Sequence, residues 1–354
     1  MSFEHLKNEV QMGMDGRNNG IPMGFDRLNR YVGLRKSMYF LIGGNTGSGK
    51  TSFIDDAFVL NPFDWYIMQK DPKIKLCIIY RSMERSRTYK LAKWVSRKIF
   101  FDQGVIIPVP KLLGWTEKMT HDEHDLFLMY EDYVGQMSEC ITIIDGPENP
   151  VGIAKELKAH AVKNGRIEQL DEYNKIYVPN DENTLTIVVI DHVGLLKTTA
   201  TQPTKKEAID KMSDELRYAR DFFGYTPVVV SQFNRDISNP IRIKNGDVEP
   251  QLEDFAESSS TQNDADVVLA LFDPMRYKVA DPSGYSLEKL KDQYGNKYFR
   301  SLRLIKNSYG SDDIRIGLGF LGDIGMFKEL PRRKDITDAD YESVVNKTFF
   351  LEKY

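Results

Sequence analysis

The sequence predicts an α/β fold in which a mostly parallel central sheet is flanked by helices. Short runs of β-branched and aliphatic residues are apolar on both faces, as in strands that are covered on both sides of a parallel sheet. These runs alternate with longer amphipathic or charged segments of helical length, which is the order expected of β–α units. With 354 residues, 41% of them hydrophobic, the chain can form a sizeable core within one elaborated domain.

Each predicted element follows from its local pattern. The predicted strands are the apolar runs 38–43 (MYFLIG), 76–80 (LCIIY), 141–145 (ITIID), 186–191 (TIVVID), 227–231 (PVVVS) and 267–272 (VVLALF). The predicted helices are 52–59, 84–101, 121–137, 150–163 and 205–223. The polar segment 164–183 is expected to be an excursion or flexible insertion. Two alternating runs, 298–305 and 314–320, predict a C-terminal β-hairpin around a turn-rich connection.

Composition limits the partners and the compartment. A net charge of -4 gives no global attraction to nucleic acid or to an anionic membrane, so any DNA contact must use a local basic surface. The N-terminal residues lack a secretory apolar region, and no uncharged run reaches transmembrane length, which predicts a cytoplasmic protein without a membrane partner. Cys77 and Cys140 lie in apolar strand-like runs, which favours buried, reduced thiols over a disulfide or a metal site.

The segment IGGNTGSGKT, residues 42–51, carries the strongest chemical signal. It fits G-x-x-x-x-G-K-[ST] between a predicted strand and a predicted helix, which is the context of a phosphate-binding loop. In such a loop, backbone N–H groups face phosphate oxygens, Lys50 reaches the β- and γ-phosphates and Thr51 ligates Mg²⁺. The predicted nucleotide-binding residues are Gly44, Asn45, Thr46, Gly47, Ser48, Gly49, Lys50, Thr51 and Ser52.

A nucleotide hydrolase also needs a carboxylate at the end of a nearby strand to hold the Mg²⁺ shell. Asp145 follows ITII and Asp191 follows TIVVI, and periodicity alone does not choose between them. Asp145 precedes Gly146-Pro147, a context typical of a helix cap or turn.

Further segments point to one family. They are GIPMGFDRLNRYVGL (20–34), IIYRSMERS (78–86), ITIIDGPENPVGIAKELKAHA (141–161), TLTIVVIDHVGLL (184–196), VVVSQFNRD (228–236) and LEDFAESSSTQNDADVVLALF (252–272). In this order they resemble the RecA-like ATPase core of replicative DnaB-type ring helicases, from about residue 20 to about residue 330. SQFNR and DFAESSSTQNDAD are the most specific matches.

The resemblance implies a role for each matching residue. Glu84 is expected to activate the attacking water as general base, Asp191 to hold Mg²⁺ through its water shell, and Gln232 to sense the γ-phosphate. The loop after Gln232 would face a central channel and contact successive phosphates of single-stranded DNA. Its expected DNA contacts are Asn234, Arg235, Arg242 and Lys244.

Two positions depart from the family pattern. Ring ATPases complete each site with a cation from the neighbouring subunit. The family hairpin reads K-x-R-N-G, whereas LIKNSYGSDD aligns Lys306 with the lysine and Ser308 with the arginine. Lys306 is therefore the expected cation, with Arg303 or Arg315 on the flanking strands as substitutes. Ala256 also replaces the arginine of the family's D-L-R element.

The sequence divides into an N-terminal linker segment, 1–19, and a RecA-like helicase ATPase domain, 20–354. No N-terminal helical or primase domain is expected before the core, and residues 3–12 are expected to form a short helix that packs on a neighbouring subunit. The resulting prediction is an ATP-dependent DNA helicase, using ATP and Mg²⁺, that forms a homo-oligomeric, hexameric ring on single-stranded DNA during replication. A helicase loader or a primase is the expected partner.

Two alternatives stay open at this point. A RecA-class recombination or repair ATPase would form filaments on DNA without unwinding it. A nucleotide-regulated module would bind DNA or replication proteins and hydrolyse little ATP. Ser308 favours the second alternative, whereas the set Lys50, Glu84, Asp191 and Gln232 favours an enzyme.

Overall fold

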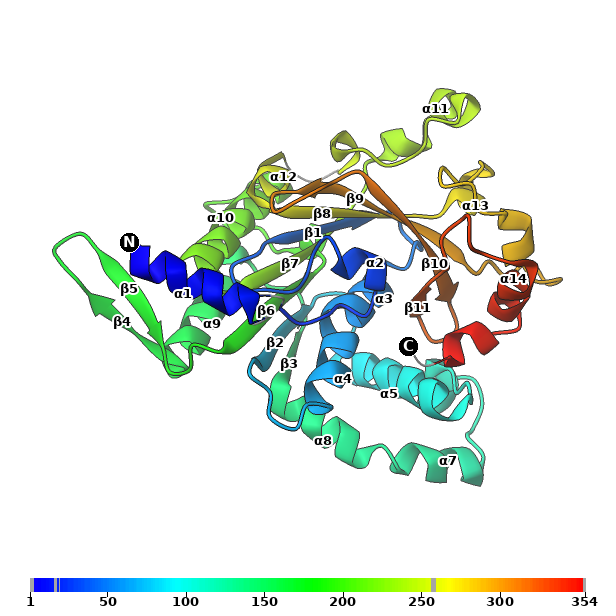
Figure 1. The fold of residues 1–354 in the computed structure, drawn as a ribbon, viewed down its shortest axis with the longest axis horizontal. Helices are drawn as coiled ribbons and strands as arrows, with labels where there is room; N and C mark the ends of the chain where they lie inside the picture. The colour runs from blue at the N-terminus through cyan, green and yellow to red at the C-terminus, as the bar shows by residue number, and fades with distance from the viewer. Residues whose placement is uncertain (1–2, 16–17, 19, 256–258, 353–354) are drawn as a thin grey trace.

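The computed structural model describes residues 3–15, 18, 20–255 and 259–352. Within these ranges the chain forms a nine-stranded sheet in the order β11-β10-β9-β8-β1-β7-β6-β2-β3, with helices on both faces (Figure 1). The parallel strands are β1 (Phe40–Gly44), β2 (Lys75–Ser82), β3 (Ile141–Asp145), β6 (Thr184–Asp191), β7 (Thr226–Gln232) and β8 (Val267–Phe272). The antiparallel strands are β9 (Phe299–Asn307), β10 (Ile314–Leu321) and β11 (Met326–Glu329). The predicted α/β class and the C-terminal hairpin are confirmed.

Strand β1 lies at the centre of the sheet, between β7 and β8. All five of its residues are buried. Phe40 and Ile42 belong to the core on one face, and Leu41 belongs to the core on the other. This alternation explains why the strand is apolar throughout, as both of its faces are covered.

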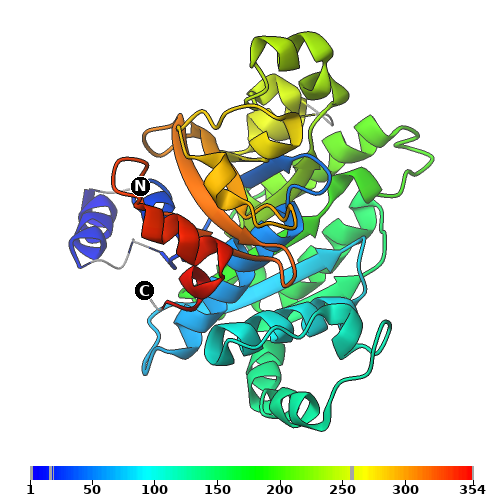
Figure 2. The same ribbon diagram turned by 90° about the vertical axis from the view of Figure 1, so that its right-hand side faces the viewer.

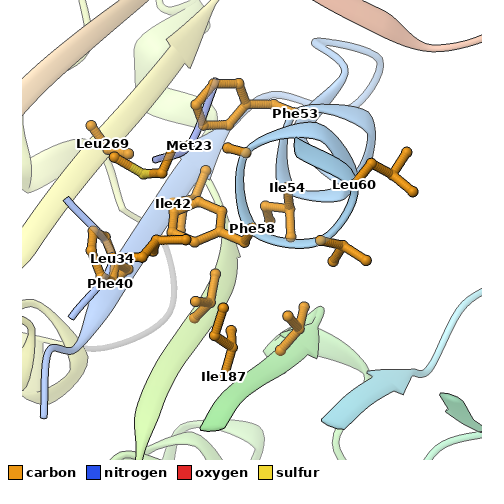
Figure 3. Packing of buried hydrophobic residues seen from close by; sticks show 14 of the residues in the cluster. Met23, Leu34, Phe40, Ile42, Phe53, Ile54, Phe58, Leu60, Ile187 and Leu269 are labelled. Atoms are coloured by element: carbon orange, nitrogen blue, oxygen red, sulfur yellow. The ribbon is translucent and has the colours of Figure 1, made fainter. Parts of the chain in front are cut away.

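One face of the sheet is covered by a continuous helical run that follows the glycine-rich segment after β1. The run consists of α3 (Lys50–Ile54), a π-helical segment (Asp55–Leu60) and α4 (Asn61–Ile67). Figure 3 shows Phe53, Ile54 and Phe58 from this run beside Phe40 and Ile42 of β1. The rings of Phe40 and Phe58 meet edge to face with centroids 5.1 Å apart. The same layer contains α5 (Arg87–Gln103), α6 (Val109–Leu112), α7 (His121–Leu128) and α8 (Glu131–Cys140).

The opposite face is covered by α9 (Pro150–Lys163) and α10 (Lys205–Phe223), whose bounds agree with the sequence prediction. Thr204 and Glu207 form a reciprocal capping box at the start of α10. Gly224 ends the helix with a φ of 72°, a left-handed conformation that glycine adopts without strain. Strong caps at both ends explain why these bounds could be predicted.

Other predicted bounds differ from the structure. The helix expected over 84–101 begins at Arg87, because the Ser86 side chain accepts a hydrogen bond from the Tyr89 N–H and caps it. The helix expected over 121–137 is divided at Tyr130. Cys140 ends a helix, so its assignment to a strand-like run was wrong.

Residues 164–183 contain a hairpin instead of an irregular excursion. Its strands are β4 (Gly165–Gln169) and β5 (Lys175–Pro179). Neither strand has a buried residue, which is why an apolar pattern did not reveal them. The Asp171 carboxylate accepts hydrogen bonds from the backbone N–H groups of Tyr173 and Asn174 and thereby fixes the turn.

The terminal parts of the domain include several short helices. The N-terminal helix α1 (Phe3–Met14) is present and lies outside the body of the domain (Figures 1 and 2). The remaining helices are α2 (Asp26–Asn29), α11 (Pro240–Asn245), α12 (Ser259–Asp264), α13 (Pro274–Tyr277) and α14 (Asp338–Val345). The Arg27 side chain pairs with Glu329 and donates to the Leu330 carbonyl, which ties α2 to the end of β11. Among the described helices, none is long and apolar enough to cross a bilayer.

Candidate nucleotide-binding site

A cavity of about 440 Å³ lies at the carboxyl ends of the central parallel strands. Ligands of open α/β sheets bind at this edge. The residues that line it come from the segment after β1, the turn after β2, the first turns of α5, the end of β6 with the segment after it, and the end of β7. The lining residues are Asn45, Thr46, Gly47, Gly49, Lys50, Thr51, Glu84, Arg85, Tyr89, Lys90, Lys93, Asp191, His192, Leu195, Val230 and Gln232.

The loop after β1 has the backbone of a phosphate-binding loop. Gly47 and Gly49 have φ values of 80° and 95°, in the region that favours glycine. Helix α3 begins at Lys50, directly after this turn. Lys50 Nζ donates to the Gly44 carbonyl at 2.6 Å and to the Asn45 carbonyl at 2.9 Å. A nucleotide phosphate would offer the same ammonium a charged acceptor, with which hydrogen bonds are stronger.

Two arginines outside the motif hold this loop from the C-terminal side of the domain. Arg300 is buried, and its Nε donates to the Ser48 carbonyl at 2.9 Å. Arg276 donates to the Thr46 carbonyl. Sequence reasoning missed both residues, because nothing in the motif indicates which distant cations contact it.

Asp191 is the carboxylate that the structure places in the cavity. Its Oδ1 accepts a hydrogen bond of 3.1 Å from Thr51 Oγ1. A hydroxyl and a carboxylate side by side are hard oxygen donors, which Mg²⁺ prefers, so the donor set fits this ion. Asp145, the other candidate, lies at the end of β3 and accepts from the Arg87 N–H at 3.0 Å.

A buried charge network fixes the other oxygen of Asp191. Tyr80 Oη donates to Asp191 Oδ2 at 3.0 Å, and Lys90 Nζ does so at 3.2 Å. The same two groups also contact Asp55 Oδ1, at 3.0 and 3.1 Å. Burial alone would raise the pKa of Asp191, but Lys90 and the hydrogen bonds outweigh it and hold the pKa below the ordinary value. Burial likewise opposes charge on Lys90, yet the two carboxylates leave its pKa raised.

Sequence reasoning missed Tyr80, Lys90 and Asp55. The signal that could have found them is the spacing of Lys90, Lys93 and Arg97, which lie on one face of α5 at intervals of three and four. Lys90 and Arg97 are buried, so this charged face of the helix points toward the protein interior. Buried cations require buried anions nearby.

Glu84 lies in the turn between β2 and α5. The Met83 N–H donates to the Asp191 carbonyl at 2.9 Å, and Ser82 Oγ donates to the Arg85 carbonyl at 2.6 Å, so both ends of the turn are anchored. The side chain of Glu84 is 51% exposed and lines the cavity, in position to meet water and a bound phosphate. Its placement in a turn, instead of in a helix, keeps the carboxylate at the mouth of the cavity.

Gln232 ends β7 and contacts His192, a residue that sequence reasoning missed. The Nε2 atoms of the two side chains are 3.3 Å apart. Burial lowers the pKa of His192, which favours the neutral ring that can accept from the Gln232 amide. The sequence did offer one indication of His192, because it directly follows Asp191.

The expected DNA contacts lie in residues 234–246, which we name the channel loop. Asn234 accepts from the Asp236 N–H and donates to the Glu253 carbonyl. Arg242 forms a bidentate pair with Asp254, one contact being 3.1 Å. Lys244 is exposed on α11, which stands out from the body in Figure 1. The Arg235 side chain lies outside the described residues.

The structure does not bring Lys306 into the cavity of its own chain. Lys306 Nζ donates to the carbonyls of Gln262 and Asn263 at 3.1 and 3.2 Å. The substitutes are also engaged: Arg303 pairs with Asp313 at 2.7 Å, and Arg315 donates to Glu249 at 2.9 Å. Ala256 lies outside the described residues.

Comparisons with known proteins agree with this geometry. The model of the DnaB-like helicase C-terminal domain family matches residues 20–329. A probable replicative DNA helicase of Trieres chinensis is 25% identical over 260 residues, which are 73% of this chain and 48% of that protein. The chain therefore spans about half the length of the curated relative it matches.

Two solved structures share the fold at 19% sequence identity. One of them, an ATPase domain, superposes with a TM-score of 0.68, covering 93% of this chain and 99% of that one. A DnaB-like replicative helicase, described with its interactions with primase, superposes with a TM-score of 0.63, covering 92% and 66%. The sheet and its helices are thus those of the RecA-like ATPase fold. Since the family model covers most of the chain, the chain belongs to the DnaB-like helicase C-terminal domain family.

Proposed function

We propose that this chain is an ATP-dependent DNA helicase of the DnaB type, which translocates on single-stranded DNA during replication. One observation carries the proposal: four separate segments of the sequence, which contribute Lys50 and Thr51, Glu84, Asp191, and Gln232, line a single cavity at the ends of adjacent strands. A loop that cradles phosphates, a metal-binding pair and an exposed carboxylate are the parts that phosphoryl transfer requires.

In the proposed reaction, a water oxygen attacks the γ-phosphorus of ATP. Glu84 accepts the proton of the water, and a new P–O bond forms as the bond to the β–γ bridging oxygen breaks. The bridging oxygen keeps the electron pair and leaves with ADP, and inorganic phosphate is the second product. Lys50 stabilises the negative charge on the phosphates, and Mg²⁺ held beside Thr51 and Asp191 would supply further positive charge.

Coupling to DNA is proposed to pass through β7. Gln232 lines the cavity and is followed after one residue by the channel loop. A γ-phosphate that binds the Gln232 amide would compete with its contact to His192, and the end of β7 would shift with it. Asn234, Arg235, Arg242 and Lys244 are the proposed contacts to successive DNA phosphates.

We also propose assembly into a homo-hexameric ring, with a helicase loader or a primase as partner. On α1, Phe3, Leu6, Val10 and Met14 recur at helical spacing and are each more than half exposed. An apolar stripe of this kind favours packing on a second copy of the chain. Residues 20–354 form the ATPase domain in this proposal, and 1–19 form the linker.

A strand-displacement assay on a forked duplex tests the proposal. Wild-type protein with ATP and Mg²⁺ should release the labelled strand, and Glu84→Gln should not. Glu172→Gln, on the exposed turn of the β4–β5 hairpin, is the matched control and should behave as wild type. Strand release by Glu84→Gln at the wild-type rate would contradict the proposed mechanism.

One observation favours the regulated binding module as a second candidate. Lys306, Arg303 and Arg315 are all engaged by acceptors outside the cavity. Without another cation the site would hydrolyse slowly. ATP binding without DNA-stimulated turnover would support this second candidate.

A further inference from the structure

The missing arginine of the hairpin raises the question of which cation completes the site. During hydrolysis, negative charge is spread over the γ-phosphoryl oxygens, and a guanidinium at this place is worth about 10³–10⁵ in rate in related reactions. Ser308 stands where the family pattern has this arginine. The nearby cations of the hairpin, Lys306, Arg303 and Arg315, are engaged by other acceptors. A cation already inside the cavity is the remaining source of this charge if turnover is fast.

Among the side chains that the structure describes, four lysines and arginines line the cavity: Lys50, Arg85, Lys90 and Lys93. Lys90 is 1% exposed and held by Asp55 and Asp191. Lys93 donates to Ser52 Oγ at 2.7 Å and lies 3.6 Å from Asp55, and burial lowers its pKa. Lys50 already has its role in the phosphate-binding loop. Arg85 remains as the cation without an assigned role.

Arg85 differs from the two α5 lysines in exposure and in pairing. Its side chain is 54% exposed, and its ion pair within the described part of the chain is a loose one, 3.9 Å from Glu84 Oε1. Exposed pairs of this kind contribute little energy. A phosphate in the cavity, which carries more charge than a carboxylate, would compete effectively for the guanidinium.

The position of Arg85 is nevertheless restrained. Ser82 Oγ fixes its carbonyl at 2.6 Å, and the next residue, Ser86, caps α5. Its guanidinium carbon lies 5.0 Å from the centroid of the Tyr89 ring, which is the range of a cation–π contact. Tyr89 is stacked on Trp115, with centroids 6.0 Å apart and planes inclined by 18°. The stacked rings of Tyr89 and Trp115 hold the Arg85 guanidinium beside Glu84 and leave the N–H donors of the guanidinium available.

We propose that Arg85 is a catalytic residue that donates hydrogen bonds to the γ-phosphoryl oxygens in the site of its own subunit. It supplies in cis the charge that the family pattern assigns to the neighbouring subunit's arginine. The inference rests on the proposed function, because it concerns the same hydrolysis step. Water adds to the γ-phosphorus, its proton passes to Glu84, and the bridging oxygen leaves with ADP, while Arg85 neutralises charge and forms no bond.

The first test compares Arg85→Ala, Arg85→Lys and the control Arg87→Ala, an exposed arginine at the first position of α5 that is not among the cavity's lining residues. Arg85→Ala should lower kcat for ATP by at least about 100-fold, with the Kd for ADP within about twofold of wild type. It should also fail to trap ADP with tetrafluoroaluminate, a mimic of the transferred phosphoryl group. Arg85→Lys should recover part of kcat, and Arg87→Ala should match wild type. Equal thermal unfolding of all variants would show that folding is not the cause.

Wild-type-like kcat and trapping in Arg85→Ala would overturn the inference and leave the proposed function standing. Absence of hydrolysis by the wild type, under conditions where it binds ATP, would overturn both. A mixing experiment separates action in cis from action in trans: Arg85→Ala is combined with Lys50→Ala, and mixed oligomers are verified by native mass spectrometry. No recovery of hydrolysis is expected, because each subunit lacks one group of its own site. Recovery would place Arg85 in the neighbour's site and contradict the assignment.

Discussion

The nucleotide cavity and the channel loop hold their charges in different ways. In the cavity, Asp191 is buried at a strand end and accepts hydrogen bonds from Thr51, Tyr80 and Lys90. In the channel loop, Lys244 is exposed on a helix of six residues. Chemistry on a phosphate requires fixed donors, whereas contact with successive DNA phosphates tolerates a mobile cation. The difference predicts that substitutions in the two regions act on different observables and with different magnitudes.

Lys50→Ala should have the largest effect. The variant loses the ammonium that neutralises the β- and γ-phosphates, so we expect basal ATP hydrolysis to fall by about 10²–10³-fold. A coupled assay of ADP release without DNA measures it. Lys244→Ala is the matched lysine control and should keep basal hydrolysis within about twofold of wild type. A similar loss in both variants would remove the distinction between the two regions.

Lys90→Met should destabilise the fold. The substitution leaves Asp55 and Asp191 buried without their shared cation, and breaking a buried pair in this way costs about 3–5 kcal/mol. Urea unfolding followed by circular dichroism measures the change in the free energy of unfolding. Lys98→Met, on the same helix in a partly exposed pair with Asp102 at 2.9 Å, should change it by less than about 1 kcal/mol. If both substitutions changed the free energy of unfolding equally, the buried network of Asp191, Asp55 and Lys90 would not be stabilising.

Lys244→Ala should weaken binding of single-stranded DNA by a few fold. The loss of one phosphate contact should also reduce the slope of log K against log salt concentration by about 0.7. Fluorescence anisotropy at several salt concentrations gives both values. Lys175→Ala, on the exposed β5 strand, serves as control. An unchanged slope in Lys244→Ala would exclude this residue from the DNA contact.

Cys77 adds a third region to the comparison, because it is a partly buried thiol of β2 that does not line the nucleotide cavity. Burial raises the pKa of the Cys77 thiol from 9.0 to about 11. At pH 8 the thiolate fraction is then about 100-fold lower than in an unperturbed thiol, so native alkylation should be slow and should accelerate as the pH rises toward 11. Mass spectrometry after iodoacetamide treatment measures the rate in native and unfolded protein. Equal rates in the two states would contradict the assigned burial.

The sequence predicted those features that local patterns encode. Six parallel strands, two capped helices and the glycine-rich loop after β1 depend on nearby residues, and their positions were foreseen. The hairpin β4–β5 was not, since strands without buried residues carry no apolar alternation. The start of α5 was misplaced because Ser86 caps the helix, so the expected first residue, Glu84, lies in the turn before it.

Local sequence patterns could not predict the ion pairs that form between distant segments of the chain. Asp191 and Asp55 share Tyr80 and Lys90 as partners only because β2, β6, α5 and the π-helical segment come together in the fold. Arg242 was expected to contact DNA, and its pairing with Asp254 joins residues twelve positions apart across a loop. Its role in DNA binding stays a prediction.

The most direct test of the account is steady-state ATP hydrolysis per subunit, measured against protein concentration with and without single-stranded DNA. The account predicts a rate that rises when DNA is added, because the strand-end cavity is coupled to the channel loop, and this stimulation should grow with protein concentration as subunits assemble on the strand. A flat rate near background, in protein that binds ATP, would contradict the motor and favour a nucleotide-regulated binding module.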